Sequence, residues 1–451
     1  MKPEFEKQNA ELFKAFLETT FFKNWKNSQR VRTEEEPGEK EEWYIENYRS
    51  LELDLGYACD LNCKYCYYSR YGKELYQNEA VKAEDVLKNT EKVMNFITKN
   101  KMYCVIDVFA GEPFVLPYIW DFFDIIYEYL KDADYSKRPS SVAVPTNLSF
   151  LKKGNEARLQ KIIDYKEKFK EIEINFALSG SFDGPFMDEE NRPHKNKPYT
   201  EEFYSNIKKY VDKLYLGLHP MVYSKNIEYW PDNFLWFGRY LGKHLYLLEV
   251  RNLEWTVEQC KHLFYFIKFM IHYIYKMVGS NRDSFLDEVG LTRGFNMLTS
   301  PFSIIGRGFG CSMQSTLNLT MHNLALVPCH RSGYKSNVTG YFDFFEDGSY
   351  DFKPNNVELY LSEQSAVATQ IAPCSACPIN LLCSGTCIGS NIEETGDPYT
   401  APPSVCRMEH IKTAAIIKGM DEINVLDFYL RNVDSKRASQ ILFVLENFQE
   451  F

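Results

Sequence analysis

Short strand-like runs of apolar residues alternate with longer helical runs over residues 48–279. Six runs predict strands, at residues 51–56, 103–109, 141–145, 171–179, 214–223 and 245–250. The clearest helix comes after the first strand, where Val86, Thr90, Val93 and Ile97 recur at helical spacing. Because such alternation is typical of a parallel sheet with crossover helices, we predict an α/β fold, a partial (β/α)6 TIM-like barrel.

Other segments flank this barrel. Residues 1–47 predict a helix and a charged linker, too short for a separate peptide-binding domain. After residue 300 the pattern changes to short strands, turns and cysteines, and from residue 412 to the end it is helical again. We therefore predict domains over 1–47, 48–300, 301–411 and 412–451.

A hairpin is predicted inside the cysteine-rich segment. The apolar runs STLNLTM and LALVPC flank His322 and Asn323. Asn tolerates the left-handed turn conformation, so we expect these two residues to make the turn.

Charge and hydropathy exclude several classes of protein. The net charge of −10 argues against a nucleic-acid partner, whose phosphates are bound mainly by Lys and Arg. The most apolar stretch, 263–278, carries Lys268, His272 and Lys276 on one helical face, which predicts an outer helix and no membrane span. No apolar run follows a basic start, so we expect no signal peptide and a cytoplasmic location.

The chain has twelve cysteines, and without a secretory signal they do not predict a disulfide framework. Ten fall into spaced groups, which favours metal or cluster ligation. Cys104 and Cys260 stand alone in apolar surroundings, where we expect buried, inert thiols.

The first group, Cys59, Cys63 and Cys66, has the spacing C-x3-C-x2-C directly after the first predicted strand. Three thiolates can hold three irons of a [4Fe-4S] cube and leave the fourth open, as a substrate-binding cluster requires. The alternatives are a zinc site lacking one ligand, or chance clustering of buried cysteines; zinc sites normally close with four ligands.

This motif resembles the signature of the radical S-adenosylmethionine (SAM) superfamily, in which an aromatic residue, here Tyr65, precedes the last cysteine. The resemblance implies that the open iron binds SAM. Reductive cleavage of SAM then yields a 5'-deoxyadenosyl radical, with the electron supplied by a donor of the flavodoxin or ferredoxin type.

Further segments resemble the SAM-binding motifs of this superfamily, and they fall at the ends of later strands. They comprise the AGEP sequence Ala110, Gly111, Glu112 and Pro113, then Asn147, Ser181 and Arg251. Ala110 stands where the family has Gly, and it would be strained if the turn required a positive φ. Turn chemistry is the alternative for Glu112, Asn147 and Ser181, and a surface salt bridge is the alternative for Arg251.

The C-terminal cysteines resemble the SPASM domain, the auxiliary-cluster module of peptide-modifying radical SAM enzymes. The resemblance assigns one [4Fe-4S] cluster to Cys374, Cys377, Cys383 and Cys406, and a second to Cys311, Cys329 and Cys387. The second lacks a fourth cysteine, so one iron is open or takes another ligand. The alternative for all seven is a treble-clef-like zinc module. The family usually has Gly where Leu324 stands, which weakens the hairpin prediction.

The two resemblances together imply a radical SAM maturase of a ribosomally made precursor peptide, with three [4Fe-4S] clusters. An intramolecular cross-link is expected. A thioether is favoured because an open iron could bind a substrate thiolate, while C–C and C–O bonds are alternatives. Leader recognition would fall to a sheet edge or a separate protein. Competing hypotheses are a formylglycine maturase, with Asp183 or Glu254 as base, and a non-catalytic iron-sulfur or zinc protein.

Overall fold

The computed structural model describes residues 50–69, 81–100, 105–135, 138–242, 248–251, 253–285, 316–331, 337–355, 373–383, 387–397, 400–431 and 435–448. The chain forms two compact units. The sheet unit combines Ile45–Met221 with Ser312–Ser365, and the helical unit combines Met1–Tyr44, Val222–Cys311 and Ala366–Phe451. The helix predicted within residues 1–47 lies outside the described residues. The four predicted domains stay a prediction.

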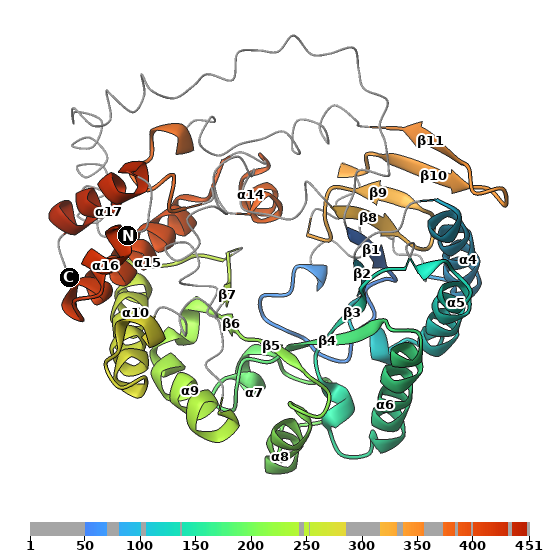
Figure 1. Ribbon diagram of the computed structural model, residues 1–451, viewed down its shortest axis with the longest axis horizontal. Coiled ribbons are helices and arrows are strands. Elements are labelled where there is room, and N and C mark those ends of the chain that lie inside the picture. Colours follow the sequence, from blue (N-terminus) through green and yellow to red (C-terminus); the bar gives the residue numbers. More distant parts are fainter. Residues whose placement is uncertain are drawn as a thin grey trace, which may run out of the picture. The chain divides into compact units, whose positions relative to one another are not determined.

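The sheet unit is built on nine strands in the order β11-β10-β9-β8-β1-β2-β3-β4-β5 (Figure 1). The parallel strands are β1 (Ser50–Asp54), β2 (Val105–Phe109), β3 (Ser141–Thr146), β4 (Asn175–Ser181), β5 (Gly217–His219) and β8 (Thr316–Thr320). The antiparallel extension consists of β9 (Ala325–Val327), β10 (Gly340–Phe344) and β11 (Tyr350–Pro354). The predicted α/β class with a parallel sheet is thus confirmed.

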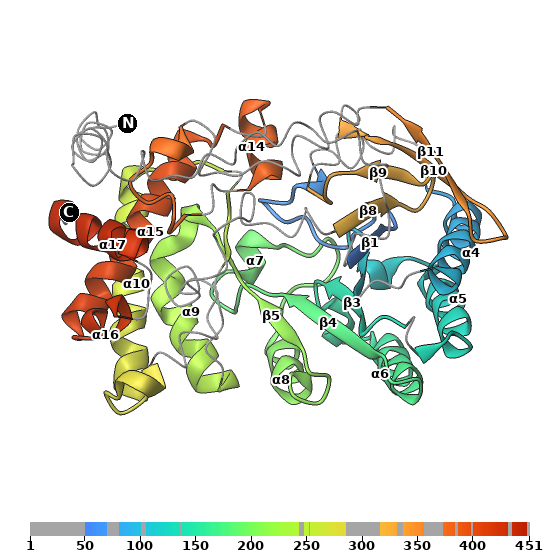
Figure 2. The ribbon, with the colours of Figure 1, turned by 45° about the horizontal axis from the view of Figure 1, so that its top comes forward.

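Crossover helices lie along one face of the parallel strands (Figure 2). They are α4 (Ala83–Lys99), α5 (Ile119–Lys131), α6 (Glu156–Glu171) and α8 (Glu201–Tyr210). In β1, Leu51 and Leu53 are fully buried and alternate with Glu52 and Asp54 on the opposite face. Because side chains alternate along a strand, the sheet has an apolar face and a polar face.

One row of the polar face is read directly from the strand register. It runs Asn318, Glu52, Asp107, Ala143, Ala177 across β8, β1, β2, β3 and β4. Asp107 is partly exposed beside the small side chains of Ala143 and Ala177. A carboxylate therefore stands on the polar face beside two small side chains.

The predicted strand 214–223 is interrupted at Pro220. It yields β5 and a short β6 (Met221–Val222), and β6 pairs with β7 (Leu248–Glu249) in a separate two-stranded sheet. Proline has no N–H to donate to a sheet ladder, which explains the break.

The predicted hairpin is present, since β8 and β9 pair antiparallel. The expectation for its turn was wrong in one detail, because Leu324, not Asn323, has the left-handed conformation (φ 56°). Asn323 instead accepts hydrogen bonds at Oδ1 from Thr320 Oγ1 at 2.6 Å and from the Ala325 N–H at 3.1 Å. The side chain of Asn323 thus closes the turn, and Leu324 takes the strained backbone position.

The helical unit is dominated by α10 (Val257–Met277) and α15 (Pro403–Glu422), which pack together. A capping box of Thr256 and Gln259 begins α10. Lys268 and His272 both contact Glu422 of α15, at 2.5 and 2.8 Å, so this predicted polar stripe is an inter-helix contact. No helix among the described residues is long and apolar enough to cross a membrane.

Other α-helices among the described residues of this unit are α9 (Trp230–Trp236), α14 (Ile388–Thr395), α16 (Leu426–Leu430) and α17 (Ser435–Asn447). The C-terminal helical region starts nine residues earlier than the predicted boundary at 412, because α15 begins at Pro403. Proline is favourable at the first position of a helix, where its missing N–H has no partner to lose. Cys406 therefore lies inside a helix.

Candidate cluster and cofactor site

The loop that carries Cys59, Cys63 and Cys66 follows β1 and lies against residues 191–195. Three backbone hydrogen bonds join the two segments, Asn62 N–H to Pro193 O at 2.9 Å, Lys64 N–H to Asn191 O at 2.8 Å, and Lys195 N–H to Asp60 O at 2.9 Å. A β-bridge pairs Leu61 with His194. Backbone contacts with residues 191–195 thus hold the cysteine loop in place. These contacts do not use the thiol groups.

The three thiols are partly buried and lie near one another. Burial, with a contribution from Glu112, raises the pKa of Cys59 to about 12. Burial also raises the pKa of Cys63 to about 11, while the guanidinium of Arg192 acts in the opposite direction. A metal or cluster that binds these sulfurs must displace their protons, since ligation requires the thiolate.

Three thiolates suit a [4Fe-4S] cluster, because each would bind a different iron of the cube and leave the fourth iron open. The Leu61 N–H also donates to Cys59 Sγ at 3.4 Å, the type of contact that orients ligand sulfurs.

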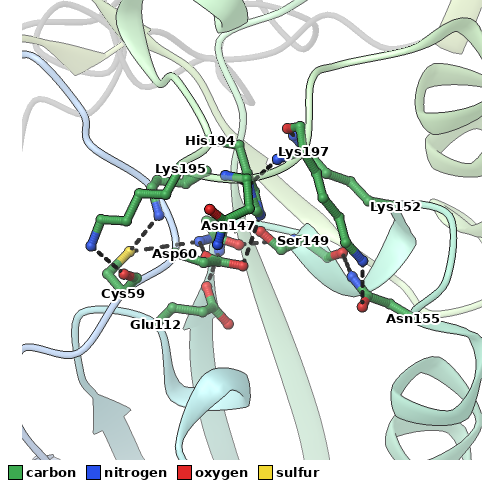
Figure 3. Close-up of polar contacts among 12 residues, drawn as sticks. Cys59, Asp60, Glu112, Asn147, Ser149, Lys152, Asn155, His194, Lys195 and Lys197 are labelled. Atoms are coloured by element: carbon green, nitrogen blue, oxygen red, sulfur yellow. Dashed lines mark hydrogen bonds and ion pairs between the residues drawn. The ribbon is translucent and has the colours of Figure 1, made fainter.

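Asp60 ties this loop to two other segments (Figure 3). Asn147 Nδ2 donates to Asp60 Oδ1 at 2.6 Å, and His194 Nε2 lies 3.2 Å from Asp60 Oδ2. Lys195 Nζ donates to the Cys59 carbonyl at 2.7 Å. Asn147 also accepts from the Ser149 N–H at 2.8 Å, so it combines the expected turn with a contact to the cysteine loop.

The AGEP turn contacts the same loop through its backbone. Gly111 donates to the Gly56 carbonyl and Glu112 donates to the Ala58 carbonyl, both at 2.8 Å. A Cβ at Gly111 would lie 2.4 Å from the Tyr57 carbonyl oxygen, so only Gly permits this approach. Ala110 has no positive φ, and the anticipated strain is absent.

Glu112 is enclosed by donors. Its carboxylate accepts from the Asn147 N–H at 2.5 Å, Thr146 Oγ1 at 2.8 Å and the Phe114 N–H at 3.2 Å. Burial raises its pKa to about 7 against the effect of these hydrogen bonds. Glu112 therefore joins the ends of β2 and β3, and the adjoining Pro113 begins a short 3-10 helix, Pro113–Val115.

Tyr65 forms a buried group with residues that sequence patterns did not single out as partners. Its hydroxyl donates to Asp183 Oδ2 at 2.5 Å and accepts from Arg192 Nη1 at 2.9 Å. Asp183 follows Ser181, which ends β4. Arg192, His194 and Lys195 were missed because the segment NRPHK has no periodicity and no recognised cysteine or glycine spacing.

The four cysteines of the first predicted auxiliary cluster lie in the helical unit. Cys374 is on a 3-10 turn (Cys374–Ala376), and Cys406 is on α15. The pKa of Cys377 is raised by burial and by the nearby thiols of Cys383 and Cys406. Cys377 thus lies near thiols from other parts of the chain, and their ligation of one cluster stays a prediction.

The remaining cysteines are distributed over both units and the part of the chain outside the described residues. Cys311 and Cys104 lie outside the described residues. Cys329 follows β9 in the sheet unit, and Cys387 precedes α14 in the helical unit. Cys260 is buried as predicted, and burial raises its pKa to about 12.

Arg251 belongs to a charge network of the helical unit. Its Nη2 lies 2.8 Å from Glu409 Oε1, and Lys412 Nζ contacts both Glu409 at 2.9 Å and Glu249 at 3.1 Å. Glu409 and Glu249 raise the pKa of Arg251 against the effect of burial. The salt bridge foreseen as the alternative is therefore present, although partly buried, and a role toward SAM stays a prediction.

Comparison with known proteins identifies relatives of this chain. The chain matches no protein-family model. It is 25% identical over 211 residues to the radical SAM cyclopropyl synthase TigE of Paramaledivibacter caminithermalis, which covers 43% of this chain and 39% of that protein. The resemblance to radical SAM enzymes is confirmed. An uncharacterised protein of Methanocaldococcus jannaschii is 27% identical over 202 residues, 44% of this chain and 59% of that protein. The matches span about two fifths to three fifths of these relatives.

Solved structures share the fold over more of the chain. The structure described as native anSMEcpe with bound AdoMet and Cp18Cys peptide has a TM-score of 0.57 and 16% identity, covering 83% of this chain and 99% of that one. Native anSMEcpe with bound AdoMet gives a TM-score of 0.56 at 14% identity, again with 83% and 99% covered. This likeness establishes the shared fold.

Proposed function

We propose that the chain is a radical SAM maturase that abstracts hydrogen from a ribosomally made precursor peptide and forms an intramolecular cross-link. The observation that carries this proposal is the loop of Cys59, Cys63 and Cys66, which follows β1 and is held by backbone hydrogen bonds to residues 191–195. Active sites of parallel α/β folds form at this end of the strands. The TigE relative and the AdoMet-bound structural neighbours support the same class of chemistry.

When bound, a [4Fe-4S] cluster at Cys59, Cys63 and Cys66 would supply reductive cleavage of SAM. The residues around it hold its ligands in place. Asp60 fixes the loop through Asn147 and His194, and Gly111 allows the AGEP turn to approach the loop. The residues proposed to surround SAM are Tyr65, Ala110, Gly111, Glu112, Pro113, Asn147, Ser181 and Arg251.

Two auxiliary clusters complete the proposal. Cys374, Cys377, Cys383 and Cys406 would hold one, and Cys311, Cys329 and Cys387 the other. The second has no fourth cysteine, which supports a thioether, because its open position could bind a substrate thiolate. The name of the TigE relative, a cyclopropyl synthase, favours carbon–carbon bond formation as the second candidate. An external flavodoxin- or ferredoxin-type donor and a separate leader-binding protein are the proposed partners, in the cytoplasm.

The first test is chemical analysis of protein purified without oxygen. We expect about 12 Fe per chain, and 5'-deoxyadenosine on addition of SAM and a strong reductant. The triple variant Cys59→Ala, Cys63→Ala, Cys66→Ala should lose about 4 Fe and all 5'-deoxyadenosine, whereas Cys260→Ala should keep both. Absence of 5'-deoxyadenosine from the unaltered, iron-loaded protein would refute the catalytic proposal.

The second test concerns the substrate. A short open reading frame beside the gene would be co-expressed with the enzyme, and the peptide analysed by tandem mass spectrometry. A cross-link removes two hydrogens and joins two residues, whereas formylglycine formation leaves an aldehyde. Trapping free peptide thiols with iodoacetamide separates a thioether, which consumes a thiol, from a carbon–carbon bond, which does not.

A further inference from the structure

His410 of α15 contacts one of the proposed auxiliary-cluster ligands. Its Nε2 lies 3.2 Å from Cys377 Sγ. On the same helix, Cys406 precedes His410 by four residues, so the two side chains lie one turn apart on one face. His410 thus lies next to two of the four proposed ligands, Cys377 and Cys406. Neither the cysteine spacing nor the family resemblance assigns it a role.

The two ring nitrogens differ in their surroundings. Nδ1 is buried and has no hydrogen-bond partner among the described residues, whereas Nε2 has the Cys377 sulfur. A neutral imidazole carries one N–H, and the nitrogen that has a partner determines which one. A cluster-bound thiolate offers lone pairs and no proton. The N–H that completes this contact is therefore on Nε2.

We propose that His410 is a positioning and tuning residue of the cluster at Cys374, Cys377, Cys383 and Cys406, donating an Nε2–H···S hydrogen bond to Cys377. This inference rests on the proposed auxiliary cluster. A hydrogen bond to a ligand sulfur withdraws electron density and stabilises the reduced, more negative cluster. The bond raises the reduction potential, so this cluster accepts an electron more readily than it would without His410.

The test measures the potential and does not depend on turnover. The background is the variant without Cys59, Cys63 and Cys66, in which both auxiliary clusters remain. The cluster at Cys374 is identified as the electron paramagnetic resonance signal that Cys383→Ala abolishes. His410→Met removes the donor at similar volume, His410→Gln retains an N–H near the Nε2 position, and His272→Gln is the matched control on α10.

We expect His410→Met to keep its iron and to shift the midpoint potential to a more negative value. His410→Gln should lie between His410→Met and the parent protein, and His272→Gln should match the parent. An unchanged potential in iron-replete His410→Met would overturn the inference while leaving the proposed function intact. Loss of about four irons in both His410 variants would also overturn it, because His410 would then be needed to hold the cluster and not to tune its potential. If the parent itself holds no cluster at Cys374, both the inference and the proposed auxiliary cluster fail.

Discussion

Leu324 combines a strained backbone with a buried side chain. When Leu324 is replaced by a smaller residue, the two properties have opposite effects on the free energy of unfolding. Its φ is 56°, and only 3% of it is exposed. Truncation of a buried Leu costs about 2–5 kcal/mol. The left-handed conformation costs an L-residue with a Cβ about 1 kcal/mol relative to Gly. We predict that Leu324→Gly is more stable than Leu324→Ala by about 1 kcal/mol, measured as the free energy of unfolding in denaturant.

Leu326 in β9 provides the control. It is fully buried, and its φ is not positive, so the preference should reverse. At that position we expect the Ala variant to be more stable than the Gly variant, since Gly weakens a strand by about 0.5–1 kcal/mol. If the Gly variant were more stable than the Ala variant at both positions, or less stable at both, the assignment of strain to Leu324 would be contradicted.

Asp107 predicts a pH-dependent stability. Burial and the nearby Glu52 raise its pKa to about 7, while His330 acts in the opposite direction. A carboxyl with a pKa higher in the folded than in the unfolded protein lowers stability as the pH rises from its unfolded to its folded pKa. We predict that Asp107→Asn stabilises the protein by about 1 kcal/mol more at pH 8 than at pH 6, in denaturant titrations at both values. An equal effect at both pH values would contradict the raised pKa.

The positions of the proposed site residues were predictable where a motif or a strand end marks them. Cys59, Cys63 and Cys66 follow β1, Glu112 follows β2 and Asn147 follows β3, as expected, while their roles stay predictions. Arg192 and His410 were not predictable, because each acts on a residue far away in the chain. Their partners, Tyr65 and Cys377, become neighbours only through tertiary packing.

Among the elements, the AGEP turn approaches the cysteine loop closely through its backbone. We predict that Gly111→Ala destabilises the protein by roughly 2–4 kcal/mol, because its Cβ would meet two backbone carbonyls that cannot move independently of the loop. Because Cys59 adjoins Ala58, this variant should also bind less iron. Thermal unfolding and iron analysis of anaerobically prepared protein measure both effects.

The neighbouring Ala110 is the matched position. Ala110→Gly adds no atoms and should change stability by less than about 1 kcal/mol with full iron content. If Gly111→Ala bound as much iron as the unaltered protein, the close approach would not control the position of Cys59.

The elements were predictable to different degrees. Five of the six predicted strands appear within a few residues of their expected bounds, because a buried strand has a strong apolar signal. The fifth was divided, since an apolar run does not reveal that Pro220 breaks the ladder. The pairing of β8 with β1 was not predicted at all, because local periodicity contains no information on which distant strand lies beside an edge.

For the whole molecule, the division into two units makes a direct prediction. A chain that joins residues 45–221 to 312–365 through a Gly/Ser linker of about 20 residues contains the complete nine-stranded sheet. We expect it to be monomeric and to unfold cooperatively. Residues 45–221 alone should aggregate, because the edge of β1 lacks its partner β8. Size-exclusion chromatography and circular dichroism compare the two. Equal behaviour of both chains would show that β8 is not needed to complete the sheet.

The place of β8 beside β1 also sets the order of events during synthesis. Asn318 of β8 and its partner Glu52 of β1 are 266 positions apart in the chain. At about 5–20 residues per second, the ribosome needs roughly 10–50 s to make the second after the first. For most of this interval the nascent chain carries Cys59, Cys63 and Cys66 but none of the seven later cysteines proposed as cluster ligands. Iron delivered in that interval would meet the first proposed ligand group before the other two groups exist.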